Sequence, residues 1–375
     1  MNEHFVKLSH GAIYHFCRNN QGICFCVMTD ERIREYEILL QNGREDFDVL
    51  VDDSDTIHLV CQDDTGSIIR LKKEGEVWEK YTVLQTRTPT SYAKNFNLQR
   101  VGSWLNILYT VEHKGHKMLS HQIIGQSENP DAVDYIKGNF SVAQDDTGDI
   151  YALYTNISGV LGWRKFLWSK KEWTEFNAVS TRGELTSAHI FVDETVHITG
   201  ITDNSILYIG NGCEQVIGTS GTTPIFMKVR GALYIVWENR RDGRVWASLS
   251  NDGGLTFQLP TEFITGRFAP VKCYHVAATS AEKIKTDFCY GYIRDNAVIL
   301  YLLNGFFNVT KFPPRPTVTA ERKDPSVEVT KLKIQLDKLS ETVSGLMRRV
   351  DRLEGGANVK RVEAEAQTST EISYE

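Results

Sequence analysis

The sequence predicts an all-β fold, a seven-bladed β-propeller, followed by a C-terminal α-helical coiled coil. Two observations predict it. Short β-rich runs recur in groups of four along residues 1–312, and a heptad register of apolar residues occupies 328–354. A Pro-containing linker at 313–327 separates the two parts, and the polar, acidic residues 355–375 have the composition of a disordered tail.

Each group of four runs is recognised from its second run. These second runs are AIYHFC, IHLVCQ, LNILYT, IYALYT, VHITGI, LYIVWE and FCYGYI, beginning at Ala12, Ile57, Leu105, Ile150, Val196, Leu233 and Phe288. Another apolar run precedes each of them, such as FDVLVD or AHIFVD, and a third follows, such as ICFCVM or VWASLS. A more polar fourth run, such as WEKYTV, closes the group.

Four strands that repeat every roughly 40 to 50 residues are typical of propeller blades. The first three strands of a blade lie between neighbouring blades and should be apolar on both faces, whereas the fourth lies at the rim. Six blades remain an alternative because the fifth group is short, and two stacked sandwiches would lack this period. The runs do not show how the ring closes.

The stretch SNDGGLTF, Ser250 to Phe257, lies between the third and fourth runs of the sixth group. It resembles the Asp-box, or BNR, repeat of sialidase-like β-propellers, whose pattern is S-x-D-x-G-x-T-aromatic. The matching positions are Ser250, Asp252, Gly254, Thr256 and Phe257. Physically the box suits a turn, because Asp caps backbone N–H groups and Gly adopts positive φ. The resemblance implies a structural fastener at the rim.

The resemblance also implies a set of active-site residues. Sialidases of this family bind the substrate carboxylate with three arginines and use a Tyr/Glu nucleophile pair with an Asp acid/base. Their first arginine lies in an Arg-Ile/Leu-Pro motif, which this chain lacks, since ERIRE at residues 31–35 has no Pro. The weak catalytic candidates are Glu238, Arg240 and Arg241, which also fit an exposed hairpin, ENRRDG.

The sequence predicts no metal site and no cofactor. QDDTG occurs at 62–66 and 144–148, where Asp and Gly suit a tight turn better than a Ca²⁺ loop. His113 and His116 fall in a predicted hairpin without further zinc ligands. Cys24 and Cys26 form a CxC whose metal or redox role competes with burial as small apolar residues, and the seven cysteines suit reduced thiols.

Composition excludes some classes of partner. The net charge is −6, with no basic run of the kind that binds nucleic acid. No apolar run approaches the roughly 18 residues of a membrane helix. The N-terminal residues lack the pattern of a secretory signal, so we expect a cytoplasmic protein, with later release or incorporation into a particle or spore layer left open.

The region 328–354 predicts self-association. Apolar residues recur in steps of three and four, at Val329, Leu332, Leu336, Leu339, Val343, Leu346, Val350 and Leu353. Mostly β-branched residues at position a, with Leu at d, favour a parallel dimer, and a trimer remains open. The competing interpretation is one amphipathic helix packed back on the propeller.

These features favour a non-catalytic, oligomeric binding or scaffold protein that presents a multivalent face to an unknown glycan or protein ligand. The alternative is a divergent sialidase-like glycoside hydrolase. Fold alone does not separate the two, because propellers serve both purposes.

Overall fold

The computed structural model describes residues 3–28, 32–86, 92–126, 129–181, 183–263, 270–280 and 285–303. The chain divides into two compact parts, Met1–Thr310 and Lys311–Glu375. The predicted linker, coiled coil and tail lie outside the described residues, and so does the last rim run, FNVTKF. The described residues form strands and no α-helix, so none of them forms a helix that could cross a membrane.

The strands of the first part follow one another in antiparallel units. The first unit contains β1 (His4–Lys7), β2 (Ile13–Asn19), β3 (Gly22–Met28) and β4 (Glu37–Gln41). The second contains β5 (Phe47–Val51), β6 (Ile57–Gln62), β7 (Ile68–Glu74) and β8 (Val77–Leu84). The third contains β9 (Asn97–Val101), β10 (Trp104–His113), β11 (His116–Ile123) and the start of β12 (Asp131–Gln144).

The remaining units follow the same plan. The fourth contains the end of β12, β13 (Ile150–Asn156), β14 (Leu161–Leu167), β15 (Glu172–Trp173) and β16 (Asn177–Ala178). The fifth contains β17 (Thr186–Val192), β18 (Val196–Thr202), β19 (Ser205–Gly210) and β20 (Cys213–Thr219). The sixth contains β21 (Gly221–Val229), β22 (Ala232–Asn239), β23 (Val245–Ser250) and β24 (Thr261–Phe263). The last described unit contains β25 (Lys272–Ala278), β26 (Phe288–Arg294) and β27 (Ala297–Leu300).

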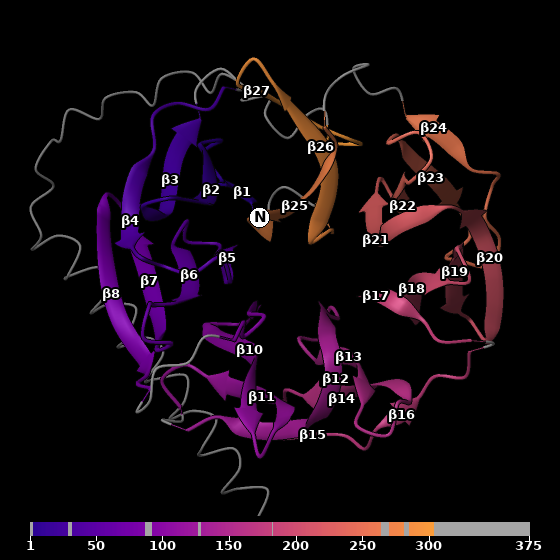
Figure 1. Cartoon of the computed structure of the whole chain (residues 1–375), viewed down its shortest axis with the longest axis horizontal. Coiled ribbons are helices and arrows are strands. Elements are labelled where there is room, and N and C mark those ends of the chain that lie inside the picture. Colours follow the sequence, from indigo (N-terminus) through magenta and orange to yellow (C-terminus); the bar gives the residue numbers. More distant parts are fainter. Residues whose placement is uncertain are drawn as a thin grey trace, which may run out of the picture. The chain divides into compact units, whose positions relative to one another are not determined.

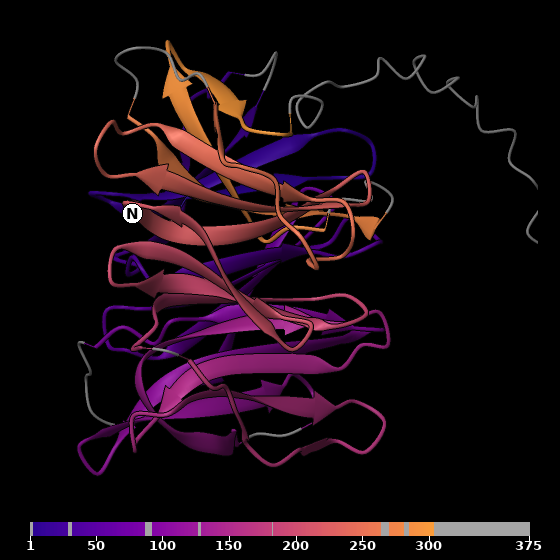
Figure 2. The ribbon, with the colours of Figure 1, turned by 90° about the vertical axis from the view of Figure 1, so that its right-hand side faces the viewer.

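The units surround a common axis, and β1, β5, β17, β21 and β25 are the strands of their units nearest to it (Figure 1). Viewed from the side, the sheets pack face to face around the ring (Figure 2). This arrangement is a β-propeller. The predicted inner runs are confirmed: IHLVCQ coincides with β6, and LYIVWE lies within β22. Among the predicted rim runs, TFQLPTEF is a strand only at Thr261–Phe263, and WTEFNA is divided between β15 and β16. The short fifth run group still supplies four strands.

Burial on both faces explains why the inner strands are continuously apolar. Along β6, Ile57, Leu59 and Cys61 pack with the first unit, whereas Val60 packs with the third. Side chains on a strand alternate between its faces, so each face of this sheet contributes to a different hydrophobic core. The fourth strands differ: β8 is mostly exposed, as expected for a rim strand.

Two features connect neighbouring units. Strand β12 pairs with β11 through its first residues and with β13 through its last, and its register breaks between Lys137 and Phe140, where Gly138 has a φ of 74°. Strand β25 pairs in parallel with β1, which joins the last described unit to the first. In this seam His4 lies opposite His275 and Phe5 opposite Val276. This parallel pairing is the closure that the sequence did not show.

Candidate axial binding site

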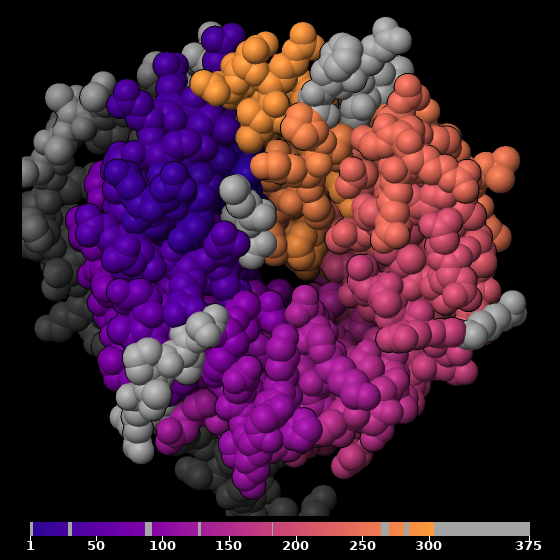
Figure 3. Space-filling model, viewed as in Figure 1, coloured from indigo at the N-terminus to yellow at the C-terminus, as the bar shows by residue number. Residues whose placement is uncertain are grey.

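A cavity of about 250 Å³ lies on the axis of the ring. Residues of β5, β9, β12, β17 and β25 line it, together with the segment Lys285–Phe288. Figure 3 shows the ring hollowed at its centre on one face. Because five inner strands from different units contribute, the walls are held by the same hydrogen bonds that build the propeller.

Amide side chains supply most of the neutral polar groups of the cavity wall. Asn97, Gln99 and Gln144 line it, and Gln99 Nε2 donates a hydrogen bond to Asn97 Oδ1 at 2.9 Å. Gln144 Nε2 donates to the carbonyl of Arg100 at 2.9 Å. Each amide carries both donors and an acceptor. With the ring of Phe288 also in the wall, the cavity combines hydrogen-bonding groups with an aromatic surface.

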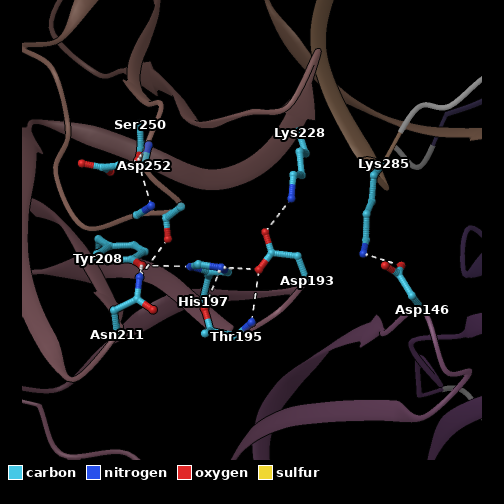
Figure 4. Close-up of polar contacts among 12 residues, drawn as sticks. Asp146, Asp193, Thr195, His197, Tyr208, Asn211, Lys228, Ser250, Asp252 and Lys285 are labelled. Atoms are coloured by element: carbon cyan, nitrogen blue, oxygen red, sulfur yellow. Dashed lines mark hydrogen bonds and ion pairs between the residues drawn. The ribbon is translucent and has the colours of Figure 1, made fainter.

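Charged groups also line the cavity. Lys285 lines it and pairs with Asp146 at 3.0 Å (Figure 4). Burial raises the pKa of Asp48 to about 7 and that of Asp287 to about 6. Burial also lowers the pKa of His275 to about 4, so its imidazole is neutral at physiological pH. The wall therefore offers a cation, two carboxyl groups and a neutral imidazole.

Polar side chains on the inner strands also join one unit to the next. Asp48 accepts a hydrogen bond from the backbone N–H of Leu98 at 2.7 Å. Ser141 accepts one from Ile190 N–H at 3.2 Å. His189 Nδ1 accepts one from Phe226 N–H at 3.3 Å. Each acceptor lies on one inner strand and each donor on the following inner strand, so these contacts hold the wall of the cavity together.

A second polar cluster lies beside the seam. His15 Nε2 is 3.4 Å from Glu3 Oε2, and His15 Nδ1 is 2.9 Å from the hydroxyl of Tyr36. Burial opposes ionisation of Glu3, but its contacts with His15 and Lys272 outweigh burial and lower its pKa. Burial raises the pKa of Tyr36, so its phenol remains protonated at neutral pH. The cluster therefore presents a tyrosine as a hydrogen-bond donor.

The residues that resemble an Asp-box, Ser250 to Phe257, form a tight turn between β23 and β24. Ser250 Oγ accepts a hydrogen bond from Gly254 N–H at 2.8 Å, and Asp252 Oδ1 accepts one from Thr256 N–H at 2.9 Å. Hydrogen bonds from the hydroxyl and N–H of Thr256 lower the pKa of Asp252 to about 2. Gly254 has a φ of 89°, which an L side chain rarely adopts.

The turn packs against the fifth unit. The Phe257 ring lies 4.8 Å from the ring of Tyr208, and Asn211 Nδ2 donates to the carbonyl of Gly253 at 2.8 Å. None of the Asp-box residues is among those that line the axial cavity. These contacts are those of a fastener between two units.

A buried network continues inward from the Asp-box (Figure 4). His197 Nδ1 is 2.9 Å from the Tyr208 hydroxyl, and His197 Nε2 is 2.8 Å from Asp193. Lys228 binds the other oxygen of Asp193 at 2.8 Å. Burial opposes ionisation of Asp193, but its bonds with His197 and Lys228 outweigh burial and lower its pKa. Since His197 is fully buried, these side chains connect the fifth unit to Lys228 of the sixth and do not face a ligand.

The predicted catalytic candidates do not reach the axial cavity. Glu238 lies near the end of β22, the second strand from the axis, where its carboxylate accepts a hydrogen bond from Thr222 at 3.3 Å. Arg240 and Arg241 are exposed in the following turn. No arginine is present among the described residues that line the cavity. The structure therefore does not assemble an arginine cluster around these three residues.

The other motifs singled out in the sequence form turns. Asp63 and Asp145, in the two QDDTG copies, each accept backbone N–H bonds from residues two and four positions further on. His113 and His116 lie opposite each other at the end of the β10–β11 hairpin, and His113 also contacts Tyr135. The seven cysteines are free thiols; Cys24 and Cys26 are buried, and Cys24 Sγ lies 3.4 Å from Cys17 Sγ.

Sequence reasoning missed the polar residues of the inner strands. His4, Asp48 and His275 lie inside apolar inner runs, HFVK, FDVLVD and CYHVAA, and Asp48 and His275 line the cavity. A polar residue within an otherwise apolar inner run is the signal that could have found them.

No protein-family model matches the chain, and no curated protein matches its sequence. Solved structures do match. An ulvan lyase from a new family of polysaccharide lyases matches with a TM-score of 0.53 and 12% identity, over 78% of this chain and 89% of that one. The fungal lectin of Aleuria aurantia, a six-bladed β-propeller, matches with a TM-score of 0.45 and 7% identity, over 71% and 96%.

A third match is AofleA from Arthrobotrys oligospora, with a TM-score of 0.42 and 11% identity, over 69% of this chain and 84% of that one. At these identities a structural match is evidence of fold and not of activity. The β-propeller fold of the described residues is shown by their own strand order.

Proposed function

We propose that this protein is a non-catalytic binding protein whose axial cavity holds one sugar residue of a glycan. The observation that carries the proposal is the wall of the cavity, where Asn97, Gln99 and Gln144 line the same space as the aromatic residue Phe288. A sugar presents hydroxyl groups that both donate and accept hydrogen bonds, and amide side chains match both needs. A concave, pre-formed site with a few polar groups is the usual form of a small-ligand pocket.

In this proposal the ring has seven blades, the last one completed by residues beyond the described range. The coiled coil 328–354 gathers two or three such rings through its heptad seam. Joining several weak sites raises the overall affinity for a repetitive glycan by roughly 10² to 10⁴. The Asp-box at Ser250–Phe257 fastens the sixth blade to the fifth and takes no part in binding.

The test is a glycan array with the full chain, followed by calorimetry with any glycan that binds. We expect Gln99→Ala to weaken binding at least about 10-fold, because one lost hydrogen bond in a buried site contributes roughly 1.5 kcal/mol. Gln41→Ala, an exposed glutamine on rim strand β4, is the matched control and should bind as wild type does. Equal affinity in both variants would place the ligand elsewhere.

The alternative, a divergent sialidase-like glycoside hydrolase, makes a different prediction. The Glu3–His15–Tyr36 cluster is the observation that favours it, because a tyrosine held by an imidazole and a carboxylate can take part in proton transfer. A panel of fluorogenic glycosides, sialosides included, separates the two functions. Turnover that Glu238→Gln or Tyr36→Phe abolishes would replace the binding proposal, whereas absence of turnover agrees with it.

A further inference from the structure

Two imidazoles and one carboxylate converge where the seam meets the second unit. His4 lies on β1, His275 on β25 and Asp48 on β5, and one ligand atom of each lies within 4.8 Å of the others. His4 Nδ1 is 3.6 Å from Asp48 Oδ1, and the rings of His4 and His275 stack at 4.1 Å. Three strands of the rigid ring therefore place three side chains of metal-binding type together.

His4 is the residue of this cluster whose burial is least compensated by hydrogen bonds within the protein. It is 1% exposed, and neither ring nitrogen makes a hydrogen bond of ordinary geometry with the described residues, although a weaker contact with the backbone of Phe47 favours its protonated form. On other inner strands, Asp48, Ser141 and His189 each accept a backbone N–H from the following strand. Buried polar atoms are almost always paired, and an unpaired one points to a bound water or ion.

The types of donor atom in the cluster suit a cation. Each imidazole can offer the lone pair of one ring nitrogen, and the side chain of Asp48 can offer a carboxylate oxygen. A positive ion beside a buried carboxylate reduces the cost of burying its charge. Two neutral nitrogens and one carboxylate oxygen form a set that prefers first-row transition metals to Ca²⁺ or Mg²⁺.

We propose that His4, Asp48 and His275 bind one divalent first-row transition metal ion, with Zn²⁺ as the probe. Metal–nitrogen and metal–oxygen bonds near 2.1 Å require ligand atoms about 3.4 Å apart in a tetrahedral site. His4 Nδ1 and Asp48 Oδ1 lie 3.6 Å apart, close to this spacing, whereas the stacked ring of His275 must turn for its lone pair to meet the same ion. Asp48 and His275 also line the axial cavity, which leaves the fourth position open to water or to a ligand in the cavity.

This site shares Asp48 and His275 with the axial cavity, but metal binding does not require a bound glycan, so it is tested by metal content. The reference protein is the full chain carrying His113→Ala and His116→Ala, because that exposed hairpin pair is the obvious place for adventitious Zn²⁺. After removal of metals and equilibrium dialysis against Zn²⁺, we expect one bound ion per chain. X-ray absorption should show two imidazoles and a carboxylate oxygen at the ion, and Co²⁺ should give the intense visible bands of a tetrahedral site.

The deciding variant is His275→Phe, which keeps an aromatic ring stacked on His4. It should weaken Zn²⁺ binding about 100-fold or more, since even outer contacts of a metal ligand change affinity by 10- to 100-fold. His121→Gln alters a buried histidine outside the cluster and should leave the Zn²⁺ affinity unchanged. Circular dichroism in metal-free buffer verifies that both variants fold.

Two results would overturn the proposal: no stoichiometric Zn²⁺ on the reference protein, or the same affinity in His275→Phe. If His275→Phe fails to fold, the absorption spectrum of the reference protein decides. An ion held by fewer than two imidazoles contradicts the site, whereas two imidazoles with a carboxylate support it.

Discussion

His4 and His275 stack with their ring centroids 4.1 Å apart, although 270 positions separate them in the sequence. The contact follows from the parallel pairing of β1 with β25, which places the two residues at the same register. Parallel neighbours in register lie about 4.8 Å apart and direct equivalent side chains to the same face. Closure of the ring therefore brings His4 and His275 together beside Asp48.

The Asp-box turn should tolerate substitution at one glycine and not at its neighbour. Gly254→Ala places a Cβ against the Tyr208 hydroxyl and strains a φ of 89°, so we expect a loss of about 3 kcal/mol in the free energy of unfolding. Gly253 also has a positive φ, 69°, but a Cβ added there meets no atom within 4 Å. Gly253→Ala should therefore cost about 1 kcal/mol. Urea denaturation measures both, and equal losses would contradict the packing against Tyr208.

The same contact predicts coupling between Gly254 and Tyr208. Tyr208→Phe removes the hydroxyl that collides with the new Cβ, and it also breaks the bond to His197. In a double-mutant cycle, Gly254→Ala should therefore cost about 1 kcal/mol less in the Tyr208→Phe background. Strictly additive losses would show that strain at φ alone explains the glycine.

The hydrogen bonds between inner strands can be tested with two serines. Ser141→Ala removes the acceptor for the N–H of Ile190, a fully buried residue, and should lower the free energy of unfolding by about 1 to 2 kcal/mol. Ser120 is also buried, but its hydroxyl has no partner among the described residues, so Ser120→Ala should change stability by less than about 0.5 kcal/mol. Equally small losses in the two variants would mean that these contacts do not stabilise the ring.

Acid should destabilise the ring through its buried histidines. Burial lowers the pKa of His121 to about 4, below the 6.5 of an exposed histidine, so the folded state keeps this ring neutral. As the pH falls from 6.5 toward 4, the unfolded chain binds a proton that the folded chain does not, and stability is lost across that window. The contribution of His121 between pH 7 and 4.5 is about 2 kcal/mol.

His121→Gln isolates this effect. Its free energy of unfolding should fall by about 2 kcal/mol less than that of the wild type between pH 7 and 4.5, whatever its stability at pH 7. Urea denaturation at both pH values gives the comparison. Parallel losses in the two proteins would mean that His121 is not held neutral in the folded state.

If residues 328–354 join chains through a coiled coil, removing them should lower the mass of the particle in solution. A chain without residues 325–375 should be a monomer by light scattering, whereas the full chain should be a dimer or trimer. Leu339→Asn at a d position should weaken association, and Gly345→Ala at an outward c position should preserve or strengthen it, by about 1 kcal/mol. An unchanged mass on truncation would refute the coiled coil.

Local pattern was enough to predict the strands and the turn. Runs such as IHLVCQ are apolar throughout because both faces of the strand are buried, and this property is written in consecutive residues. The turn of SNDGGLTF was equally local, since Ser250, Asp252 and Thr256 bond to one another within eight residues. The prediction that the motif lies between strands and away from the axis rested on its place in the repeat.

The axial site could not be predicted in the same way. Glu238, Arg240 and Arg241 are adjacent in sequence, but the second strand of a blade holds them apart from the cavity. His4, Asp48 and His275 are distant in sequence, and ring closure brings them together. Sequence alone determined the strands, their order and the turn, because these depend on neighbouring residues. Tertiary structure alone decided which polar side chains meet at the axis, because that depends on how the strands are brought around the ring.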